Sequence, residues 1–101
     1  MGPDMRKQQP HHASDGQRIR RLAALENVEI LFTCDEKLRK HEISRPDALW
    51  ALKTCSVAKA ERCKGAWHRI VRGFDRDEVE VFLVVTVEPD IKRIVVLDGW
   101  R

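Results

Sequence analysis

The last third of the chain constrains the fold most, because it holds three strand-like segments separated only by short turns. The first is a basic segment, Ala66–Arg72, the second is the apolar run Val79–Val87, and the third is Arg93–Leu97. Val and Ile, which favour strands, fill the second and third segments. Strands joined by short turns pair antiparallel. The sequence therefore predicts an antiparallel meander as the C-terminal part of the fold.

Helical patterns precede the meander. Ser14 and Gln17 have the spacing of a capping box, which predicts a helix over Asp15–Glu26. Within this helix Ile19 and Leu22 recur on one side, whereas the arginines fall largely outside that side. The helix is therefore amphipathic, and we expect its apolar side to pack on a sheet.

Two further capping boxes begin at Thr33 and Ser44. The first predicts a short charged helix that ends at His41. The second predicts a helix over Asp47–Cys55, with Pro46 tolerated in its first turn.

Two other segments are strand candidates. Val28–Thr33 is β-branched and aromatic, which favours a strand, whereas Ser56–Lys64 is polar and is either a loop or an edge strand. The order is therefore a helix, a strand, two helices and then three or four strands. Helices followed by strands with short turns indicate an α+β fold rather than alternating βαβ units. We expect N-terminal helices packed on a three- to four-stranded antiparallel sheet.

The length of 101 residues fits one domain. Residues 1–13 have almost no apolar side chains and carry Pro and Gln, so a disordered tail is expected there. The single folded domain is expected to span residues 14–101.

The cysteines and the apolar runs limit the class of protein. Cys34, Cys55 and Cys63 form no C-x-x-C pair, and no histidine lies at a recognised zinc-ligand spacing. We therefore expect reduced thiols, a cytoplasmic location, and neither a metal nor a cofactor. The longest apolar run, Val81–Val87, is far shorter than the ~20 residues that cross a membrane as a helix, so no membrane association is expected.

The charge of the chain is concentrated in one segment. The formal net charge is +3, yet residues 59–76 contain six basic residues and two acidic ones. Such a segment either contacts phosphate groups, as in RNA-binding proteins, or protects an edge strand from unwanted pairing. If it binds RNA, its candidate phosphate ligands are Arg62, Lys64, Arg69 and Arg76.

His68 is the candidate catalytic residue of this segment. Strand alternation places His68 and Arg72 on one face and Trp67 and Val71 on the other, which we expect to face the core. Cleavage of RNA without a metal requires a base for the 2′-hydroxyl, an acid for the leaving oxygen and cations for the charged phosphorane. A histidine can be base or acid, because it titrates near neutral pH. His68 with Arg72 and Arg93 is therefore a candidate ribonuclease site; otherwise His68 is an ordinary strand residue with one hydrogen bond.

From Ile30 onward the chain resembles a small bacterial family allied to the RelE and MqsR ribonuclease toxins. The family has a leading strand, a short basic helix, an Ile-Ser pair followed by a helix, and then three strands. The matching positions are Phe32-Thr33, Leu38-Arg39, Ile43-Ser44, Ala48-Leu49, Arg72-Gly73, Val81–Val87 and Ile94-Val95-Val96. Such sequences usually carry a His near the end of the first strand and an Arg before the Ile-Ser. Here Thr33 or Cys34 and His41 stand in these places.

The resemblance implies a RelE/MqsR-like fold and a toxin-like, metal-independent endoribonuclease of a toxin–antitoxin type system. Its partners would be RNA and a cognate neutralising protein. The residues leave a second function open, a non-catalytic binding module on the same scaffold, such as an inhibitor, an adaptor or an antitoxin-like protein. The missing family histidine and the absence of tyrosine favour this alternative. The mild positive charge argues against a third, a mimic that blocks a host nuclease complex.

Overall fold

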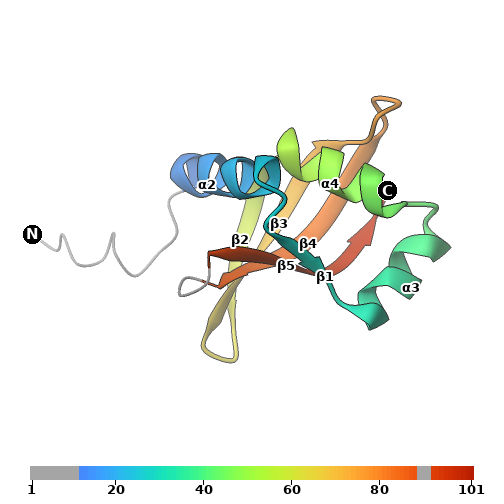
Figure 1. Ribbon diagram of the computed structural model, residues 1–101. Helices are drawn as coiled ribbons and strands as arrows, with labels where there is room; N and C mark the ends of the chain where they lie inside the picture. Colours follow the sequence, from blue (N-terminus) through green and yellow to red (C-terminus); the bar gives the residue numbers. More distant parts are fainter. Residues whose placement is uncertain (1–11, 89–91) are drawn as a thin grey trace, which may run out of the picture.

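This computed structural model describes residues 12–88 and 92–101, and the side chains of those residues from Ser14 onward. The described part of the chain contains three helices and five strands (Figure 1). The α+β class predicted from the order of elements is confirmed. The elements are α2 His12–Ala24, β1 Val28–Ile30, α3 Phe32–Lys40, α4 Arg45–Lys53, β2 Ser56–Cys63, β3 Ala66–Phe74, β4 Glu80–Glu88 and β5 Arg93–Trp100.

The strands form one mixed sheet in the order β1-β5-β4-β3-β2. Strands β2 to β5 are antiparallel neighbours, as the meander predicts, whereas β1 lies on the far edge and runs parallel to β5. The expected sheet of three or four antiparallel strands is therefore wrong in this detail. A pattern of residues within one strand carries no information about a parallel partner at the other end of the chain. The polar segment Ser56–Lys64, for which the sequence allows a loop or an edge strand, forms edge strand β2.

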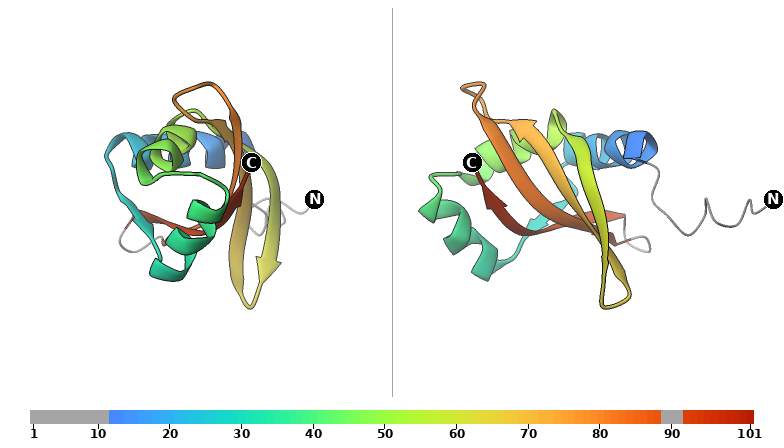
Figure 2. Two further views of the ribbon diagram at one scale, coloured as in Figure 1. Left: turned by 90° about the vertical axis from the view of Figure 1, so that its right-hand side faces the viewer. Right: turned by 180° about the vertical axis from the view of Figure 1, so that it is seen from behind.

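All three helices cover the same face of the sheet (Figure 2). α2 packs on β2 and β5, α4 packs on β3, and α3 packs on β5. Alternate strand residues meet the helices, and Val71, Leu83 and Val96 are fully buried there together with Ile19 and Leu52 of the helices. The opposite face carries no helix among the described residues.

α2 begins earlier than the sequence indicates. The helix starts at His12, so the capping pair Ser14 and Gln17 lies within it. The rest of the expected tail, residues 1–11, lies outside the described residues, and so does the turn expected at Pro89-Asp90.

The first strand is shorter than expected. β1 ends at Ile30, and Phe32 and Thr33 form the first turn of α3 instead of continuing the strand. Cys34 and Leu38 are four residues apart and both 0% exposed, so their burial against the sheet sets a helical phase. This packing overrides the strand propensity of the preceding residues.

α4 has the N-cap that the sequence predicts, but it spans Arg45–Lys53 instead of the expected Asp47–Cys55. Ser44 is its N-cap, and the Ser44 hydroxyl accepts a hydrogen bond from the backbone N–H of Asp47 at 3.2 Å. Pro46 lies in the first turn, where its missing N–H is not needed. The buried side of the helix includes the small residues Ala48 and Ala51, which let β3 approach the helix backbone closely.

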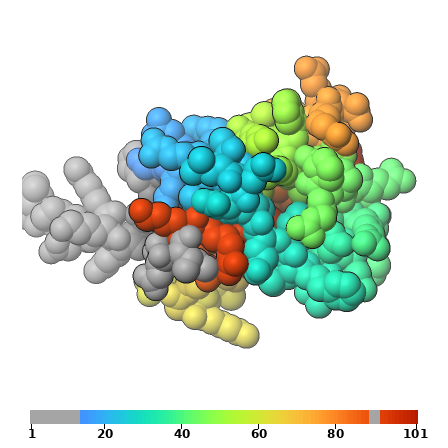
Figure 3. All heavy atoms as spheres, in the orientation of Figure 1, coloured from blue at the N-terminus to red at the C-terminus, as the bar shows by residue number. Residues whose placement is uncertain are grey.

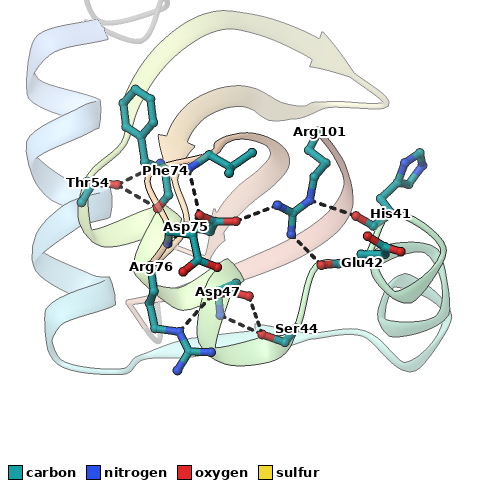
Figure 4. Close-up of polar contacts among 11 residues, drawn as sticks. His41, Glu42, Ser44, Asp47, Thr54, Phe74, Asp75, Arg76 and Arg101 are labelled. Atoms are coloured by element: carbon teal, nitrogen blue, oxygen red, sulfur yellow. Dashed lines mark hydrogen bonds and ion pairs between the residues drawn. The ribbon is translucent and has the colours of Figure 1, made fainter.

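A polar network around Asp75 closes one end of the molecule (Figure 4). The Asp75 carboxylate accepts a hydrogen bond from the backbone N–H of Val79 at 2.9 Å and thereby organises the turn between β3 and β4. Arg101 donates to the same carboxylate at 2.6 Å and to the backbone carbonyls of His41 and Glu42. One guanidinium therefore joins this turn to the loop that follows α3.

Gly73 of β3 lies against the backbone of α4, so we expect Gly73→Ala to be strongly destabilising. A methyl group there would lie 2.1 Å from the carbonyl oxygen of Ala51, whereas the nearest atoms to one at Gly99 would be the side-chain ends of Leu38 and Leu83, at 2.5 and 2.7 Å, with the carbonyl oxygen of Phe82 at 3.2 Å. Side-chain ends move aside more easily than a helix backbone. Gly73→Ala should lower the free energy of unfolding by roughly 3 kcal/mol, and the matched control Gly99→Ala by clearly less. Urea unfolding measures both, and equal losses would contradict the contact between β3 and α4.

Asp75 should stabilise the fold at neutral pH more than in acid. The hydrogen bond from Val79 and the Arg101 guanidinium hold the pKa of Asp75 below its ordinary value. The folded state therefore binds this proton less tightly than the unfolded chain, and the stabilisation is lost as the pH falls through the folded-state pKa. We expect Asp75→Asn to lower the melting temperature at neutral pH, with a difference from wild type that shrinks below about pH 4. Thermal unfolding across this range measures the difference, and one that grows in acid would refute the linkage.

Candidate functional site on the β2–β3 hairpin

The face of the sheet that the helices leave open has an apolar centre. Ile70 of β3, Phe82 and Val84 of β4, and Trp100 of β5 lie on it, each half-buried. The rings of Phe82 and Trp100 stack, with centroids 5.8 Å apart and an interplanar angle of 13°. Charged residues surround this centre, and the predicted catalytic residues are among them.

One end of the open face continues onto a projecting hairpin (Figure 1). The pairing of β3 with β4 begins only at Arg69, whereas its pairing with β2 reaches back to Ala66, opposite Cys63. The hairpin therefore extends beyond the rest of the sheet, and its outer end stands out from the body of the molecule (Figure 3, yellow). We call residues 59–70 the hairpin arm.

The turn of the hairpin arm determines which residues face each other. Lys64 and Gly65 form the turn with φ angles of 50° and 83°, and two successive residues at positive φ are typical of a tight type I′ turn. Glu61 then lies directly opposite His68. Lys59, two residues before Glu61, projects from the same face of the strand. Lys59, Glu61 and His68 therefore gather on the open face, and we call them the arm cluster.

The arm cluster combines an anion, a cation and an imidazole. The Lys59 Nζ lies 2.6 Å from a Glu61 carboxylate oxygen, and both side chains are more than half exposed. Residues opposite each other in an antiparallel pair have Cβ atoms ~4.5–5.5 Å apart, so Glu61 and His68 reach one small group together. The hydrogen bond and charge of Lys59, and then the charge of His68, hold the pKa of Glu61 below its ordinary value. Glu61 is therefore ionised at neutral pH, although the same lowering makes it a weaker base than an ordinary glutamate.

Arg69, a predicted phosphate ligand, faces the helices instead of the open face. The residue is 8% exposed, and its Nε donates to the Asp15 carboxylate of α2 at 2.8 Å. The predicted alternation along β3 is confirmed, because Val71 is buried on this same face while His68 lies on the other. Trp67, also expected to face the core, instead lies on the hairpin arm beside Arg62. Arg69 joins α2 to the base of the hairpin arm, and its charge is already compensated by Asp15.

Arg72 and Arg93, predicted to be catalytic with His68, do not join it. Arg72 lies four residues along β3, ~13 Å from His68, and forms an ion pair with Glu80. Arg93 is on β5, two strands away, where it donates to Glu88 at 2.9 Å and lies 3.4 Å from a carboxylate of β1. Each guanidinium already has a carboxylate partner, so neither is a free phosphate clamp.

Two of the other predicted phosphate ligands remain on the hairpin arm. The guanidinium carbon of Arg62 lies 5.9 Å from the ring centroid of Trp67, and Lys64 is exposed in the turn. Arg76 lies beyond the other end of β3, where it forms an ion pair with Asp47 at 3.0 Å. Lys64 is therefore at the tip of the hairpin arm, Arg62 projects from the face opposite the arm cluster, and Arg76 lies at the far end of β3.

A second group of cations lines a cleft of about 540 Å³ beside α2. Arg18 and Arg21 of α2 and Lys92, just before β5, contribute to it with the side-chain amides of Gln17 and Asn27. No acidic residue lines it within the described chain, and its three cations form no ion pair there. The cleft lies at the same end of the sheet as the hairpin arm, because β3 and β5 both begin at this end. We call it the cationic cleft.

The three cysteines form no disulfide, and Cys63 is exposed on the hairpin arm. Cys34 and Cys55 are buried, and burial raises the pKa of both, that of Cys55 to about 11. Neither is a reactive thiolate at neutral pH. Within residues 12–88 and 92–101, no three His, Cys, Asp or Glu side chains come together as metal ligands do.

Lys59 and Glu61 are the site residues that the sequence analysis missed. The signal lay in the Lys64-Gly65 pair, which is the kind of dipeptide that a two-residue turn uses. Counting three residues outward from each side of this pair places Glu61 opposite His68. Without a strand assignment for the preceding segment, no such register was available.

Comparison with known proteins identifies no relative, since no protein-family model, curated protein or solved structure matches the chain. Among the described residues, no helix is both long and apolar enough to span a bilayer. The function must therefore be argued from the site itself.

Proposed function

We propose that this protein is a toxin-like, metal-independent endoribonuclease whose chemistry is performed by the arm cluster. The observation that carries the proposal is the cross-strand pairing of Glu61 with His68, with Lys59 on the same face. An ionised carboxylate, an imidazole and a cation are the groups that RNA cleavage through its own 2′-hydroxyl requires. The reaction is the one that the RelE/MqsR resemblance implies, but the base and the cation are now Glu61 and Lys59.

The proposed reaction is a transesterification. Glu61 accepts the proton of a 2′-hydroxyl, and the 2′-oxygen attacks the adjacent phosphorus. His68, in its protonated form, donates a proton to the 5′-oxygen as the bond from phosphorus to that oxygen breaks. Protonation of Glu61 neutralises the carboxylate that pairs with Lys59, and the charge of Lys59 is then available to stabilise the phosphorane. One product ends in a 2′,3′-cyclic phosphate and the other begins with a 5′-hydroxyl, so atoms and protons balance.

The RNA backbone would be held by cations at the same end of the molecule. Arg62 and Lys64 lie on the hairpin arm itself, and the cationic cleft offers three more cations without ion-pair partners in the described chain. Contacts with phosphates supply affinity without sequence preference and weaken with salt. A neutralising partner that covers the hairpin arm would prevent cleavage.

The proposal predicts cleavage of a single-stranded RNA oligonucleotide in the presence of EDTA. Glu61→Gln and His68→Asn should each slow cleavage by at least ~100-fold, because each removes one proton-transfer group. His41→Asn is the matched control, since His41 is an exposed histidine at the end of α3 and should leave the rate unchanged. Gel analysis gives the rates, and mass spectrometry of the fragments identifies their ends.

Circular dichroism first establishes that each variant is folded. If the folded wild-type protein neither cleaves RNA nor arrests growth on expression, the protein is not this enzyme. If cleavage occurs but leaves 5′-phosphate ends, or if His41→Asn slows it as much as His68→Asn, the arm cluster is not its acid–base machinery.

A non-catalytic binding module is the second candidate, and the ion pairs of the open face favour it. Arg72, directly opposite Phe82 of the stacked pair, is paired with Glu80, and Arg93, at the other end of β5, is paired with Glu88. An apolar centre within a charged rim is the arrangement of a protein-binding surface. Salt-dependent binding of RNA without cleavage, or no binding of RNA at all, would support this candidate over the enzyme.

A further inference from the structure

We propose that the outer edge of β1 is a docking site at which an extended segment of a partner protein adds a sixth strand to the sheet. The inference rests on β1 and α4, which lie apart from the arm cluster, and it does not depend on RNA cleavage. It is based on two neighbouring features. One is a strand edge without a partner among the described residues, and the other is an apolar cleft lined by one acidic and one basic residue that form no ion pair in the described chain.

Among the described residues β1 pairs only with β5, so its other edge has no partner strand there. The backbone N–H of Ile94 in β5 donates to the carbonyl of Asn27 at 2.9 Å. Hydrogen bonding alternates along a strand, so Glu29 also directs its backbone groups toward β5. Val28 and Ile30 therefore direct their backbone N–H and C=O groups outward, where a further strand would bind.

The same two residues line a cleft of about 430 Å³ beside β1. Its other wall is formed by Pro46 and Leu49 of α4. Free backbone groups next to an apolar cleft are what strand addition uses, since main-chain hydrogen bonds give affinity and a pocket for a side chain gives selectivity. Leu31, which follows β1, is itself 38% exposed and extends the apolar surface.

Two charged residues complete the lining of the cleft. Glu26 lies just before β1, and Arg45 is the first residue of α4. Neither forms an ion pair with another described residue. The segment that fits this site therefore has an apolar side chain for the cleft, flanked by a basic residue for Glu26 and an acidic residue for Arg45.

A second copy of the chain fits the cleft less well. It would present its own β1, whose Ile30 is buried in its own core and whose Val28 packs against that core. Strand-to-strand pairing of two copies would then leave both clefts without a side chain to fill them. A separate segment with a free apolar side chain satisfies the backbone edge and the cleft together.

The probes are two blocked peptides, Lys-Thr-Val-Leu-Val-Thr-Glu and the charge-reversed Glu-Thr-Val-Leu-Val-Thr-Lys, because the direction of the added strand is not fixed by the structure. One order should bind tighter by roughly fivefold, the effect of one or two exposed ion pairs. The double variant Glu26→Lys/Arg45→Glu should reverse the preference. Methylation of alternate peptide nitrogens on the pairing edge should weaken binding by roughly tenfold, because it removes main-chain hydrogen bonds.

Fluorescence anisotropy measures the affinities, and amide hydrogen exchange locates the contact. The amides of Val28 and Ile30 should exchange rapidly in the free protein and become protected by the peptide, whereas that of Glu29 should be protected in both states. The proposal fails if neither peptide binds, if the charge swap does not reverse the preference, or if protection appears elsewhere. It also fails if Val28 and Ile30 are already protected in a dimer of the free chain, since the occupant is then a second copy.

Discussion

The tight turn at Lys64 and Gly65 is the constraint on which the candidate site depends. Because both residues take positive φ, the strands leave the turn in one register, and Glu61 meets His68 across the hairpin arm. A slip of one residue would move Glu61 to the opposite face and separate the two groups. Lys59 is two residues from Glu61 and would move with it to the face opposite His68. The chemistry proposed for the arm cluster therefore depends on the positive φ angles of Lys64 and Gly65.

The base of the hairpin arm is held by the ion pair of Arg69 with Asp15. Both side chains are largely buried, with exposed fractions of 10% and 13%, and the pair fixes α2 over β3. A buried ion pair is weak evidence for stability, but a well-aligned one determines how two elements meet. Here it places the helix that carries Arg18 and Arg21 at the same end as the arm cluster. At the other end, Arg101 and Asp75 join the turn between β3 and β4 to the loop after α3. One end of the sheet therefore carries the candidate site, and the other end carries contacts that stabilise the fold.

Patterns that depend on neighbouring residues predicted much of the fold. The apolar strand segments that became β4 and β5, the Ser44 cap and the two faces of β3 are all local features and are all present. The parallel pairing of β1 with β5 is not local, and the helical state of Phe32 depends on burial of residues that follow it. Neither could be obtained from propensity alone.

The candidate site also shows that local sequence patterns do not predict contacts between distant parts of the chain. Arg69, Arg72 and Arg93 were selected as phosphate ligands because of their residue type and position in strands. Strand alternation gives the face on which an arginine lies, but it does not give the carboxylate beside it. Those carboxylates come from other parts of the chain, as Asp15 does for Arg69. Glu61, in contrast, was within reach of sequence reasoning, because the turn residues determine its partner.

The pH dependence of kcat/KM for RNA cleavage tests the arm cluster most directly. The acidic limb should report the ionisation of Glu61, whose pKa is lowered chiefly by the hydrogen bond and charge of Lys59. Lys59→Met removes that stabilisation of the carboxylate, so the acidic limb should move to higher pH, while Lys64→Met on the same hairpin arm should leave it in place. An acidic limb that does not move in Lys59→Met, or that moves equally in both variants, would contradict the assignment of Glu61 as the base.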